Sequence, residues 1–461
     1  MKKPASLKIT IIGAGSVSFT PPTLRDIFLN ERINSVPLEI CLMDILEEPL
    51  KVSQAYAEAA TKKLGRKAVI TSTLSLEKAL EGASFVVTAI EKDRYFYWSQ
   101  DFHIPRKYGC NQIYGENGGP GGMFHTLRNL GPILEIARAM ERICPDAWLI
   151  NYSNPEAKLV EAISKLTRIK CVGLCHGVGM GLDQLSGLLE MPVEDLDVTA
   201  CGLNHFGWFQ MVKHKKTGED LYPLLKEKER QADWLANWDE IALSRIMLRI
   251  YGLYPYPGAN HIGEYIRWSE SYLAGAMMQY FYDPATESPW KTGKIPEFVY
   301  SAAHLREKPL FMRSDAKEPV YTFENIFMMR EEDLVPSHEV GVPIIESIAF
   351  DIPRELLAVN MLNKGNIPGL ADDMAVELPA HVNGSGIHPK KMAPLPDAIT
   401  EMIRIQGVIH KLVIEAFVEH SRNKLLQAIL LDPTVSTYNN SVEMINEMCE
   451  VQKAVLPPLH W

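Results

Sequence analysis

A cysteine and two histidines are the residues of this chain best suited to binding a transition metal. Cys175 and His176 directly follow the apolar run Ile169-Lys-Cys-Val-Gly-Leu174, and His205 follows Asn204 further along the chain. Thiolate and imidazole ligands suit borderline divalent metals, and a bound metal keeps the thiol deprotonated. Cys175 and His205 are too far apart in sequence for spacing to prove a site. A small buried thiol and a core imidazole therefore stay open as the alternative.

A second group of reactive side chains lies in the segment 260–265, Asn-His-Ile-Gly-Glu-Tyr. If this segment is helical, His261 shares one helix face with Glu264 and Tyr265. An imidazole, a carboxylate and a phenol so arranged are candidates for a general base. The alternative is a helix start with an exposed glutamate.

A glycine turn near the N-terminus indicates a dinucleotide site. The apolar run 7–12 ends in Gly13-Ala-Gly15-Ser16-Val-Ser18, and a second apolar run ends in Asp44. Such glycines allow a tight turn and the close approach of a pyrophosphate to a helix N-terminus. A carboxylate at the second strand binds a ribose 2′-hydroxyl and repels a 2′-phosphate, which favours NAD over NADP. An ordinary strand-turn-helix with a solvated aspartate is the alternative.

Two further segments follow later strands of the same pattern. The glycine cluster 115–122, which includes Glu116, is expected to form a loop facing a phosphate or a sugar, with a flexible surface loop as the alternative. Asn154 precedes Pro155 at the end of another strand. An asparagine side chain both donates to and accepts from sugar hydroxyls, although it also serves as a helix N-cap.

The elements that must position these residues alternate between strand and helix. Apolar runs predict strands over 7–12, 39–44, 68–73, 84–90, 147–152 and 169–174, and helical patterns over 75–81, 130–144 and 156–166. This alternation of strands and helices predicts an α/β fold with a Rossmann-type, doubly wound parallel sheet. We expect residues 1–195 to form an NAD-binding domain and residues 196–461 an α+β domain for substrate and oligomerisation.

The second part of the chain does not alternate between strand and helix in this way. It contains a charged amphipathic region over 221–249, a pattern typical of a buried helix over 269–281, short strands and turns over 338–390, and mostly helix over 397–449. Neither an internal repeat nor a low-complexity linker separates the two parts, so we expect them to pack closely.

Composition narrows the function classes. The chain has 461 residues and a formal net charge of −10, which argues against a nucleic-acid or anionic membrane partner. No segment approaches the 18 apolar residues of a membrane span, and the start of the chain does not resemble a signal peptide. Seven cysteines, an odd number, fit reduced thiols better than a disulfide framework, so we expect a cytoplasmic protein.

Taken together, these motifs resemble glycoside hydrolase family 4, the NAD- and manganese-dependent glycosidases. The resemblance extends over the whole chain, including Asn363-Lys-Gly-Asn-Ile-Pro368 in the second part. It implies a second domain similar to the C-terminal domains of lactate and malate dehydrogenases. The form Cys175-His-Gly-Val178 resembles the members that cleave α-linked galacturonic acid.

The resemblance implies a role for each candidate residue. It makes Cys175 and His205 the ligands of Mn²⁺ or a similar divalent metal, and His176 the general acid. The base is Tyr265 or its rival His261. Residues 116, 154 and 204 are the substrate-binding candidates (Glu116, Asn154 and Asn204), and the expected NAD contacts are Gly13, Gly15, Ser16 and Asp44. Arg94, Arg128 and Arg267 are unranked candidates for binding a substrate carboxylate.

The implied reaction is a hydrolysis with an internal redox step. Hydride passes from sugar C3 to NAD⁺, a base removes the acidified C2 proton, and the C1 oxygen leaves with a proton from the acid. Water then adds at C1 and the steps reverse, so NAD⁺ is regenerated and the metal acts as a Lewis acid. The substrate would be a small glycoside or an oligogalacturonide, and the enzyme a homodimer or homotetramer. The alternatives are activity on α-glucuronides or neutral α-hexosides, a lactate- or malate-type dehydrogenase, and a non-catalytic NAD-binding regulator.

Overall fold

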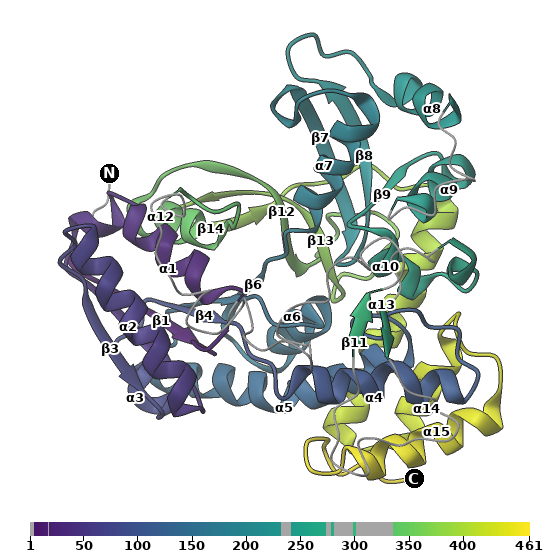
Figure 1. The fold of residues 1–461 in the computed structure, drawn as a ribbon, viewed down its shortest axis with the longest axis horizontal. Coiled ribbons are helices and arrows are strands. Elements are labelled where there is room, and N and C mark those ends of the chain that lie inside the picture. Colours follow the sequence, from purple (N-terminus) through teal and green to yellow (C-terminus); the bar gives the residue numbers. More distant parts are fainter. Residues whose placement is uncertain (1–3, 17, 232–240, 273–277, 281–297, 301–334) are drawn as a thin grey trace.

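The computed structural model describes residues 4–16, 18–231, 241–272, 278–280, 298–300 and 335–461. Its first part is a sheet of six parallel strands in the order β3-β2-β1-β4-β5-β6 (Figure 1). The strands are β1 (Leu7–Ile12), β2 (Leu38–Met43), β3 (Val69–Thr73), β4 (Phe85–Thr88), β5 (Trp148–Asn151) and β6 (Lys170–Gly173). This strand order is that of the dinucleotide-binding fold, so the predicted Rossmann-type sheet is confirmed.

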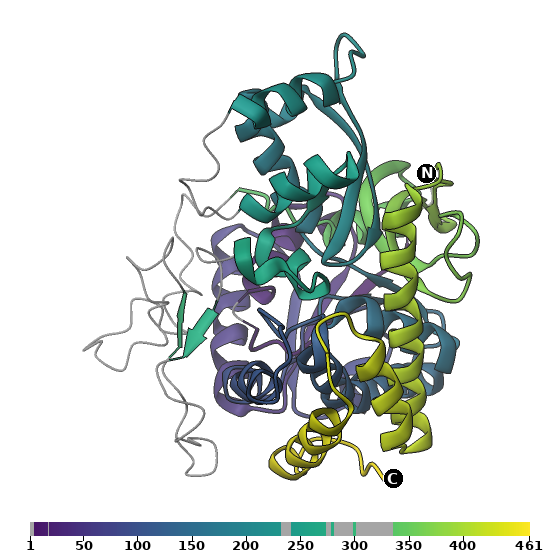
Figure 2. The same ribbon diagram turned by 90° about the vertical axis from the view of Figure 1, so that its right-hand side faces the viewer.

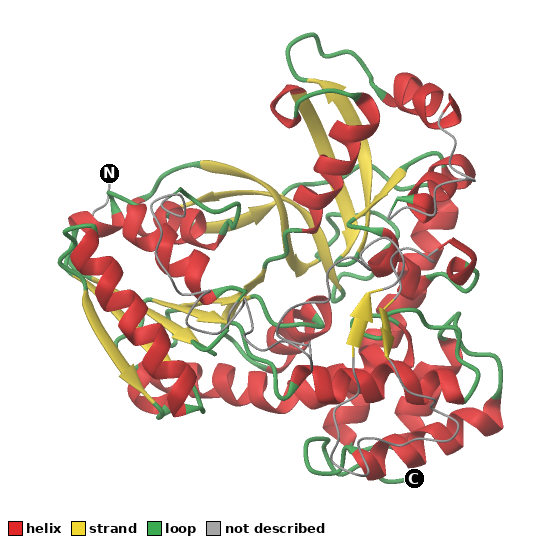
Figure 3. Ribbon diagram, in the orientation of Figure 1, coloured by secondary structure: helices red, strands yellow, loops and turns green. Residues whose placement is uncertain are grey.

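Helices cover both faces of this sheet because its strands are apolar on both sides (Figure 3). One core cluster joins the sheet to helices α3, α5 and α6, and another joins it to α1, α2 and α12 (Gly341–Phe350). The helices of this part are α1 (Thr20–Leu29), α2 (Glu47–Lys63), α3 (Leu76–Leu80), α4 (Arg94–Lys107), α5 (Gly119–Ile143), α6 (Glu156–Leu166) and α7 (Gly177–Leu189).

The second part of the chain continues the same sheet with antiparallel strands. After β6 the order runs β12-β13-β7-β8-β9, and β12 joins β6 through the pair Asn360 and Gly173. These strands are β7 (Leu196–Leu203), β8 (Phe206–His214), β9 (Tyr254–Tyr256), β12 (Arg354–Leu362) and β13 (Ala375–Asn383), with β14 (Gly386–Pro389) paired to β13. The α+β character expected after residue 195 is therefore present. The domain boundary at 195 and 196 stays a prediction, because the sheet runs across it.

The remaining helices surround this extension. Helices α8 (Tyr222–Gln231), α9 (Ala242–Tyr251), α10 (Ala259–Ile262) and α12 (Gly341–Phe350) come before the C-terminal group. That group consists of α13 (Asp397–Glu419), α14 (Arg422–Leu431) and α15 (Tyr438–Val451), as the helical pattern predicted. It packs against α4 and α5 through a separate apolar cluster (Figure 2). Among the described residues, none of the helices combines the length and the apolar character needed to cross a membrane.

Two local predictions are wrong. The glycine cluster 115–122 is a loop only at its start, because α5 begins at Gly119. A Cβ on Gly121 would lie 2.3 Å from the Asp101 carbonyl oxygen, so tight packing, not loop flexibility, explains this glycine. The segment 269–281 is not one buried helix: Ser269–Tyr272 is a 3-10 turn and Met278–Tyr280 is strand β10, paired with β11 (Phe298–Tyr300). A short apolar run does not distinguish the two structures.

Candidate functional site

The carboxyl ends of the parallel strands meet at one edge of the sheet, which is where open α/β sheets bind ligands. Gly13 follows β1, Asp44 follows β2, Asn154 lies just beyond β5, and Cys175 lies just beyond β6. The topology therefore brings the predicted nucleotide turn and the Cys175-His176 pair to the same edge of the molecule.

The turn after β1 has the geometry of a nucleotide-binding loop. Gly13 has φ +80°, and a Cβ there would lie 2.3 Å from the Ala89 carbonyl oxygen, so only glycine fits. The Gly15 amide donates a 2.8 Å hydrogen bond to Asp44 Oδ2, and the Ser16 hydroxyl accepts from the Phe19 amide. The open turn and its adjacent carboxylate fit an NAD pyrophosphate and ribose. Val17, within this turn, lies outside the described residues.

Within the described part of the chain, a carboxylate and two imidazoles form a candidate metal site. One donor atom each from Glu116, His205 and His261 lie within 4.8 Å of one another. The rings of His205 and His261 have centroids 4.3 Å apart. Imidazole and carboxylate donors suit Mn²⁺ and similar divalent ions, so the donor set fits the predicted metal.

The three side chains come from three separate elements. Glu116 belongs to the loop before α5, His205 occupies the β7–β8 turn with φ +67°, and His261 lies on α10. The Glu116 loop is fixed by Glu264, whose Oε1 accepts from the backbone amides of Glu116 (2.6 Å) and Asn117 (2.9 Å). A Cβ on Gly118 would lie 2.6 Å from the Glu264 Cβ, so Gly118 allows this contact.

Burial sets the charge state of the cluster. Burial lowers the pKa of His205 to about 4, and burial with the neighbouring His205 lowers the pKa of His261 to about 3. Burial alone would raise the pKa of Glu116, but Arg94 and the two imidazoles outweigh it and lower that pKa to about 2. Burial and the Glu116 charge raise the pKa of Glu264 to about 8. At neutral pH the cluster therefore holds two neutral imidazoles and a carboxylate, which is the protonation state that binds a metal.

Cys175 lies outside this three-residue cluster. Its thiol contacts the Asn204 side chain, and burial together with the nearby Glu377 raises its pKa. The Asn204 side chain is held by Glu377, whose Oε1 accepts from Asn204 Nδ2 (3.2 Å) and Asn360 Nδ2 (3.0 Å). Without a metal the thiol is therefore protonated. The predicted pairing of Cys175 with His205 as metal ligands stays a prediction.

His176, the predicted general acid, has a carboxylate neighbour. It stands at the N-cap of α7, half exposed, with Nδ1 3.6 Å from Glu339 Oε1. The interaction with Glu339 is the main cause that raises the pKa of His176. No local motif links His176 with Glu339, because the two residues lie far apart in the sequence.

The two candidate bases have different surroundings. His261 faces His205 and Tyr114, with ring centroids 4.3 and 5.2 Å away. Tyr265 is buried against Phe206, with ring centroids 5.0 Å apart, and burial raises its pKa well above the usual value. Of the two, only His261 is a member of the cluster with Glu116 and His205.

The cluster has other polar neighbours that the sequence did not reveal. His125 links the cluster to Glu91, which follows β4. Its Nε2 lies 2.6 Å from Glu91 Oε2, and its Nδ1 lies 2.7 Å from the Glu116 carbonyl oxygen. Lys158 Nζ donates to the Asn117 carbonyl oxygen, and burial lowers the pKa of this lysine to about 8.

Asn154 remains available for a ligand. The bond to Pro155 is cis, and the Asn154 carbonyl oxygen accepts a 2.7 Å hydrogen bond from Asn129. The N-cap of α6 is Pro155, so the alternative role of Asn154 as a helix cap is wrong.

Two of the three arginine candidates are paired with carboxylates. Arg128 is buried with Asp101, its Nη2 2.8 Å from Oδ2. Arg94 pairs with Glu116 and lies 3.5 Å from Glu91. Arg267 is exposed.

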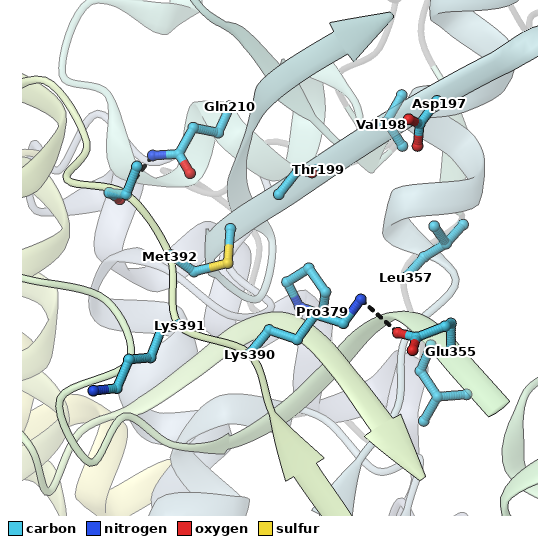
Figure 4. Close-up of a pocket in the computed structure, with 12 residues that line it drawn as sticks. Asp197, Val198, Thr199, Gln210, Glu355, Leu357, Pro379, Lys390, Lys391 and Met392 are labelled. Carbon is cyan, nitrogen blue, oxygen red and sulfur yellow. Dashed lines mark hydrogen bonds and ion pairs between the residues drawn. The ribbon is translucent and has the colours of Figure 1, made fainter. Parts of the chain in front are cut away.

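A cavity of about 420 Å³ lies elsewhere, between β7, β8, β12 and β13 (Figure 4). Lys390 pairs with Glu355 at its edge, and Gln210 and Met392 also line it. None of its lining residues belongs to the predicted site.

The fold and the site define a protein with a dinucleotide-type sheet and a candidate metal site beside it. Comparison with known proteins identifies the class further. Residues 8–191 match the family model described as family 4 glycosyl hydrolase, and residues 200–435 match the model of that family's C-terminal domain. The chain belongs to glycosyl hydrolase family 4 and is a glycosidase, as the sequence motifs predicted.

Its relatives differ in the sugar that they are named for. The chain is 30% identical to an alpha-glucosidase of Erwinia rhapontici, over 96% of both chains, and 30% identical to an alpha-galactosidase of Bacillus subtilis, also over 96% of both. It is 27% identical to an alpha-galacturonidase of Thermoanaerobacter italicus, over 97% of this chain and 96% of that one. A 6-phospho-alpha-glucosidase from gut microorganisms, solved with NAD and Mn²⁺, has the same fold, with a TM-score of 0.75 at 22% identity over 99% of this chain and all of that one.

Proposed function

We propose that this glycosidase uses NAD⁺ and Mn²⁺, or a similar divalent metal, to cleave α-linked galacturonic acid. The observation that carries the proposal is the cluster of Glu116, His205 and His261 beside the sheet edge that holds the glycine turn. Most glycosidases act through a pair of carboxylates alone and need neither a nucleotide nor a metal. A nucleotide turn beside a metal-ligating cluster instead fits redox chemistry at a sugar carbon.

The residues of this chain have distinct roles in the proposed reaction. A bound NAD⁺ would supply a hydride acceptor for a sugar carbon, and a bound divalent metal would supply a Lewis acid that makes the neighbouring C–H bond more acidic. Gly13, Gly15 and Ser16 form the turn for the pyrophosphate, and Asp44 binds a ribose hydroxyl. We also propose that Asn154 and Asn204 bind the sugar.

The two proton transfers belong to different side chains. His176 holds a proton for the leaving C1 oxygen, and Glu339 favours its charged form. Removal of the C2 proton belongs to His261 or Tyr265. His261 belongs to the cluster of Glu116 and His205, whereas Tyr265 is buried against Phe206 with the Glu264 carboxyl nearby.

A neutral α-hexoside is the second candidate substrate. A uronic acid needs a cation for its carboxylate, but Arg94 and Arg128 already pair with carboxylates of the chain. The relatives named for neutral sugars are also slightly more similar to this chain than the galacturonidase. The form of residues 175–178 favours the uronide, and the pairing of the arginines favours the neutral sugar.

A panel of p-nitrophenyl glycosides tests the proposal. It includes the α-galacturonide, α-glucuronide, α-glucoside, α-galactoside and their 6-phosphates, each with and without NAD⁺ and Mn²⁺. We expect release of p-nitrophenol from the α-galacturonide only when both are present, with no net NADH. A faster α-hexoside would establish the second candidate. Oxidation of 2-hydroxy acids with stoichiometric NADH and no glycoside cleavage would overturn the proposal.

We also propose that the enzyme is a cytoplasmic homodimer or homotetramer. All seven cysteines are free, which fits a reducing compartment. Helix α13 exposes the apolar side chains of Ile405, Val408 and Val418. Light scattering of the purified protein tests the oligomer, and a monomer at micromolar concentration would contradict it.

A further inference from the structure

We infer that Tyr152 is a positioning residue for His176, the proposed general acid, because its hydroxyl holds the Glu339 carboxylate beside that imidazole. The inference rests on the proposed function for the role of His176. The sequence motifs assigned no role to Tyr152, which directly follows β5.

The ring of Tyr152 is fixed at the nucleotide edge of the sheet. It is buried and stacked on the ring of Phe19, with centroids 4.7 Å apart and planes inclined by 24°. Phe19 is the N-cap residue of α1, and its amide donates to the Ser16 hydroxyl in the glycine turn. The first part of the chain therefore determines where the Tyr152 hydroxyl lies.

Both partners of this hydroxyl belong to the second part of the chain. The hydroxyl accepts a 3.1 Å hydrogen bond from the amide of Gly341, the first residue of α12, where amides have no partner within the helix. A Cβ on Gly341 would lie 2.5 Å from the hydroxyl oxygen, so glycine allows this close approach. The proton of the hydroxyl is donated to the Glu339 carboxylate. Tyr152 therefore binds both ends of the segment 339–341.

A second contact holds the same segment against α1. The Ser337 amide donates a 2.7 Å hydrogen bond to Asp26 Oδ1, and the Ser337 hydroxyl donates to Asp26 Oδ2. The Glu339 amide in turn donates to the Ser337 hydroxyl over 3.1 Å. Glu339 is thus fixed through its backbone by Ser337 and through its side chain by Tyr152, and its Oε1 lies 3.6 Å from His176 Nδ1.

Apolar packing explains the ring of Tyr152 but not its hydroxyl. The ring belongs to an apolar core cluster, in which a phenylalanine would fill the same space. A buried hydroxyl is costly unless it is hydrogen-bonded, and here its partners are Gly341 and Glu339. A carboxylate at one ring nitrogen orients an imidazole and leaves the other nitrogen to transfer the proton. The hydroxyl is therefore placed to keep His176 Nε2 directed at a leaving oxygen.

The dependence of the rate on the leaving group tests this inference. Tyr152→Phe removes the hydroxyl and keeps the ring. A basic leaving oxygen needs its proton more than an acidic one, so a displaced acid should cost most with a poor leaving group. We expect kcat/KM for phenyl α-galacturonide to fall about tenfold more than kcat/KM for p-nitrophenyl α-galacturonide. If an α-hexoside is the better substrate, its two aryl glycosides replace them. An equal loss on both substrates, or no loss, would overturn the inference, because a structural defect lowers both alike.

Gly341→Ala tests the same contact without removing the hydroxyl. Its Cβ displaces the hydroxyl of Tyr152, so we expect the same larger loss on the phenyl glycoside. The control is Tyr108→Phe, which removes a hydroxyl that donates to Glu447 Oε2 over 2.7 Å, outside the proposed site. Its ratio of the two kcat/KM values should match the wild type. Circular dichroism checks that each variant is folded.

Nitrogen NMR separates this inference from the proposed function, because it needs no substrate. In protein labelled with ¹⁵N-histidine, the signals of His176 are those missing from His176→Gln. We expect its Nδ1 signal to shift in Tyr152→Phe toward the position that it has in Glu339→Gln, and to stay in place in Tyr108→Phe. An unshifted Nδ1 signal in Tyr152→Phe would overturn the inference even if the enzyme cleaves glycosides. A shifted signal in a protein that cleaves no glycoside would support the positioning by Tyr152 and overturn only the proposed function.

Discussion

The imidazole rings of His205 and His261 lie with their centroids 4.3 Å apart and their planes inclined by 73°. His205 comes from the β7–β8 turn and His261 from α10, so the pair forms only when both elements are folded in place. Each ring has a side-chain amide at Nδ1, from Asn117 and from Asn260. Replacing either amide therefore tests the candidate metal site without changing the histidines themselves.

Replacement of Asn260 by alanine should weaken metal binding. The change removes the acceptor that fixes the His261 tautomer, and loss of such a partner costs about 10- to 100-fold in metal affinity. Isothermal titration with Mn²⁺ measures the effect, and Asn440→Ala on α15 is the matched control. Equal affinity of Asn260→Ala and the wild type would show that the Asn260 contact has no role in metal binding.

Asp44→Asn should relax the discrimination between NAD⁺ and NADP⁺. The carboxylate stands at the glycine turn, where the proposed NAD site would use it to repel a 2′-phosphate. Removing its charge while keeping its shape should reduce the ratio of the NADP⁺ and NAD⁺ dissociation constants about tenfold, or about 1.4 kcal/mol. Fluorescence titration measures both constants, with Asp397→Asn as the control. A ratio that stays the same would remove Asp44 from the nucleotide site.

Glu339→Gln should narrow the pH range of activity from its alkaline side. The interaction with Glu339 raises the pKa of His176, so the charged, proton-donating form persists to higher pH. Without that carboxylate the pKa of His176 falls, and the descending limb of kcat/KM against pH moves to lower pH. A pH profile of glycoside cleavage measures this. An unmoved descending limb in the variant would contradict the role of His176 as the acid.

His410 should make the stability of the fold depend on pH. Burial lowers the pKa of His410 to about 4, below the value of about 6.5 in the unfolded chain. The unfolded state therefore binds more protons in this window, so stability falls as the pH drops from about 6.5 to about 4. His410→Gln should remove on the order of 1–3 kcal/mol of that loss.

Urea unfolding at pH 7.5 and pH 5 measures this difference. His388→Gln, which removes an exposed imidazole, should keep the pH dependence of the wild type. Identical pH dependence in His410→Gln and the wild type would contradict the argument.

The parallel half of the fold could be predicted because its signals are local. Each of the six strands is a short apolar run that ends in a turn, and the observed strand bounds differ from the predicted ones by at most two residues. The glycine turn directly follows the first strand and Asp44 ends the second, so the nucleotide edge could be predicted from local sequence as well. The start of the helix at Gly119 could not be predicted, because glycines that allow close packing look the same in sequence as glycines of a loop.

The candidate metal cluster could be predicted only in part because its members converge from separate elements. Glu116, His205 and His261 have no local spacing that links them, and the sequence separated them into substrate, metal and base candidates. Glu264 was predicted to be either a source of a general base or an exposed residue at a helix start, yet it is buried and holds the Glu116 loop. Contacts of this kind depend on tertiary packing, which no short motif records.

Hydrolysis in D₂O tests the central claim most directly. The proposed reaction removes the C2 proton of the sugar and later replaces it from solvent, whereas direct displacement at C1 leaves the C2–H bond intact. We expect the sugar released from p-nitrophenyl α-galacturonide, or from the best substrate of the panel, to carry deuterium at C2 by NMR. Complete retention of the original hydrogen at C2 would contradict the account.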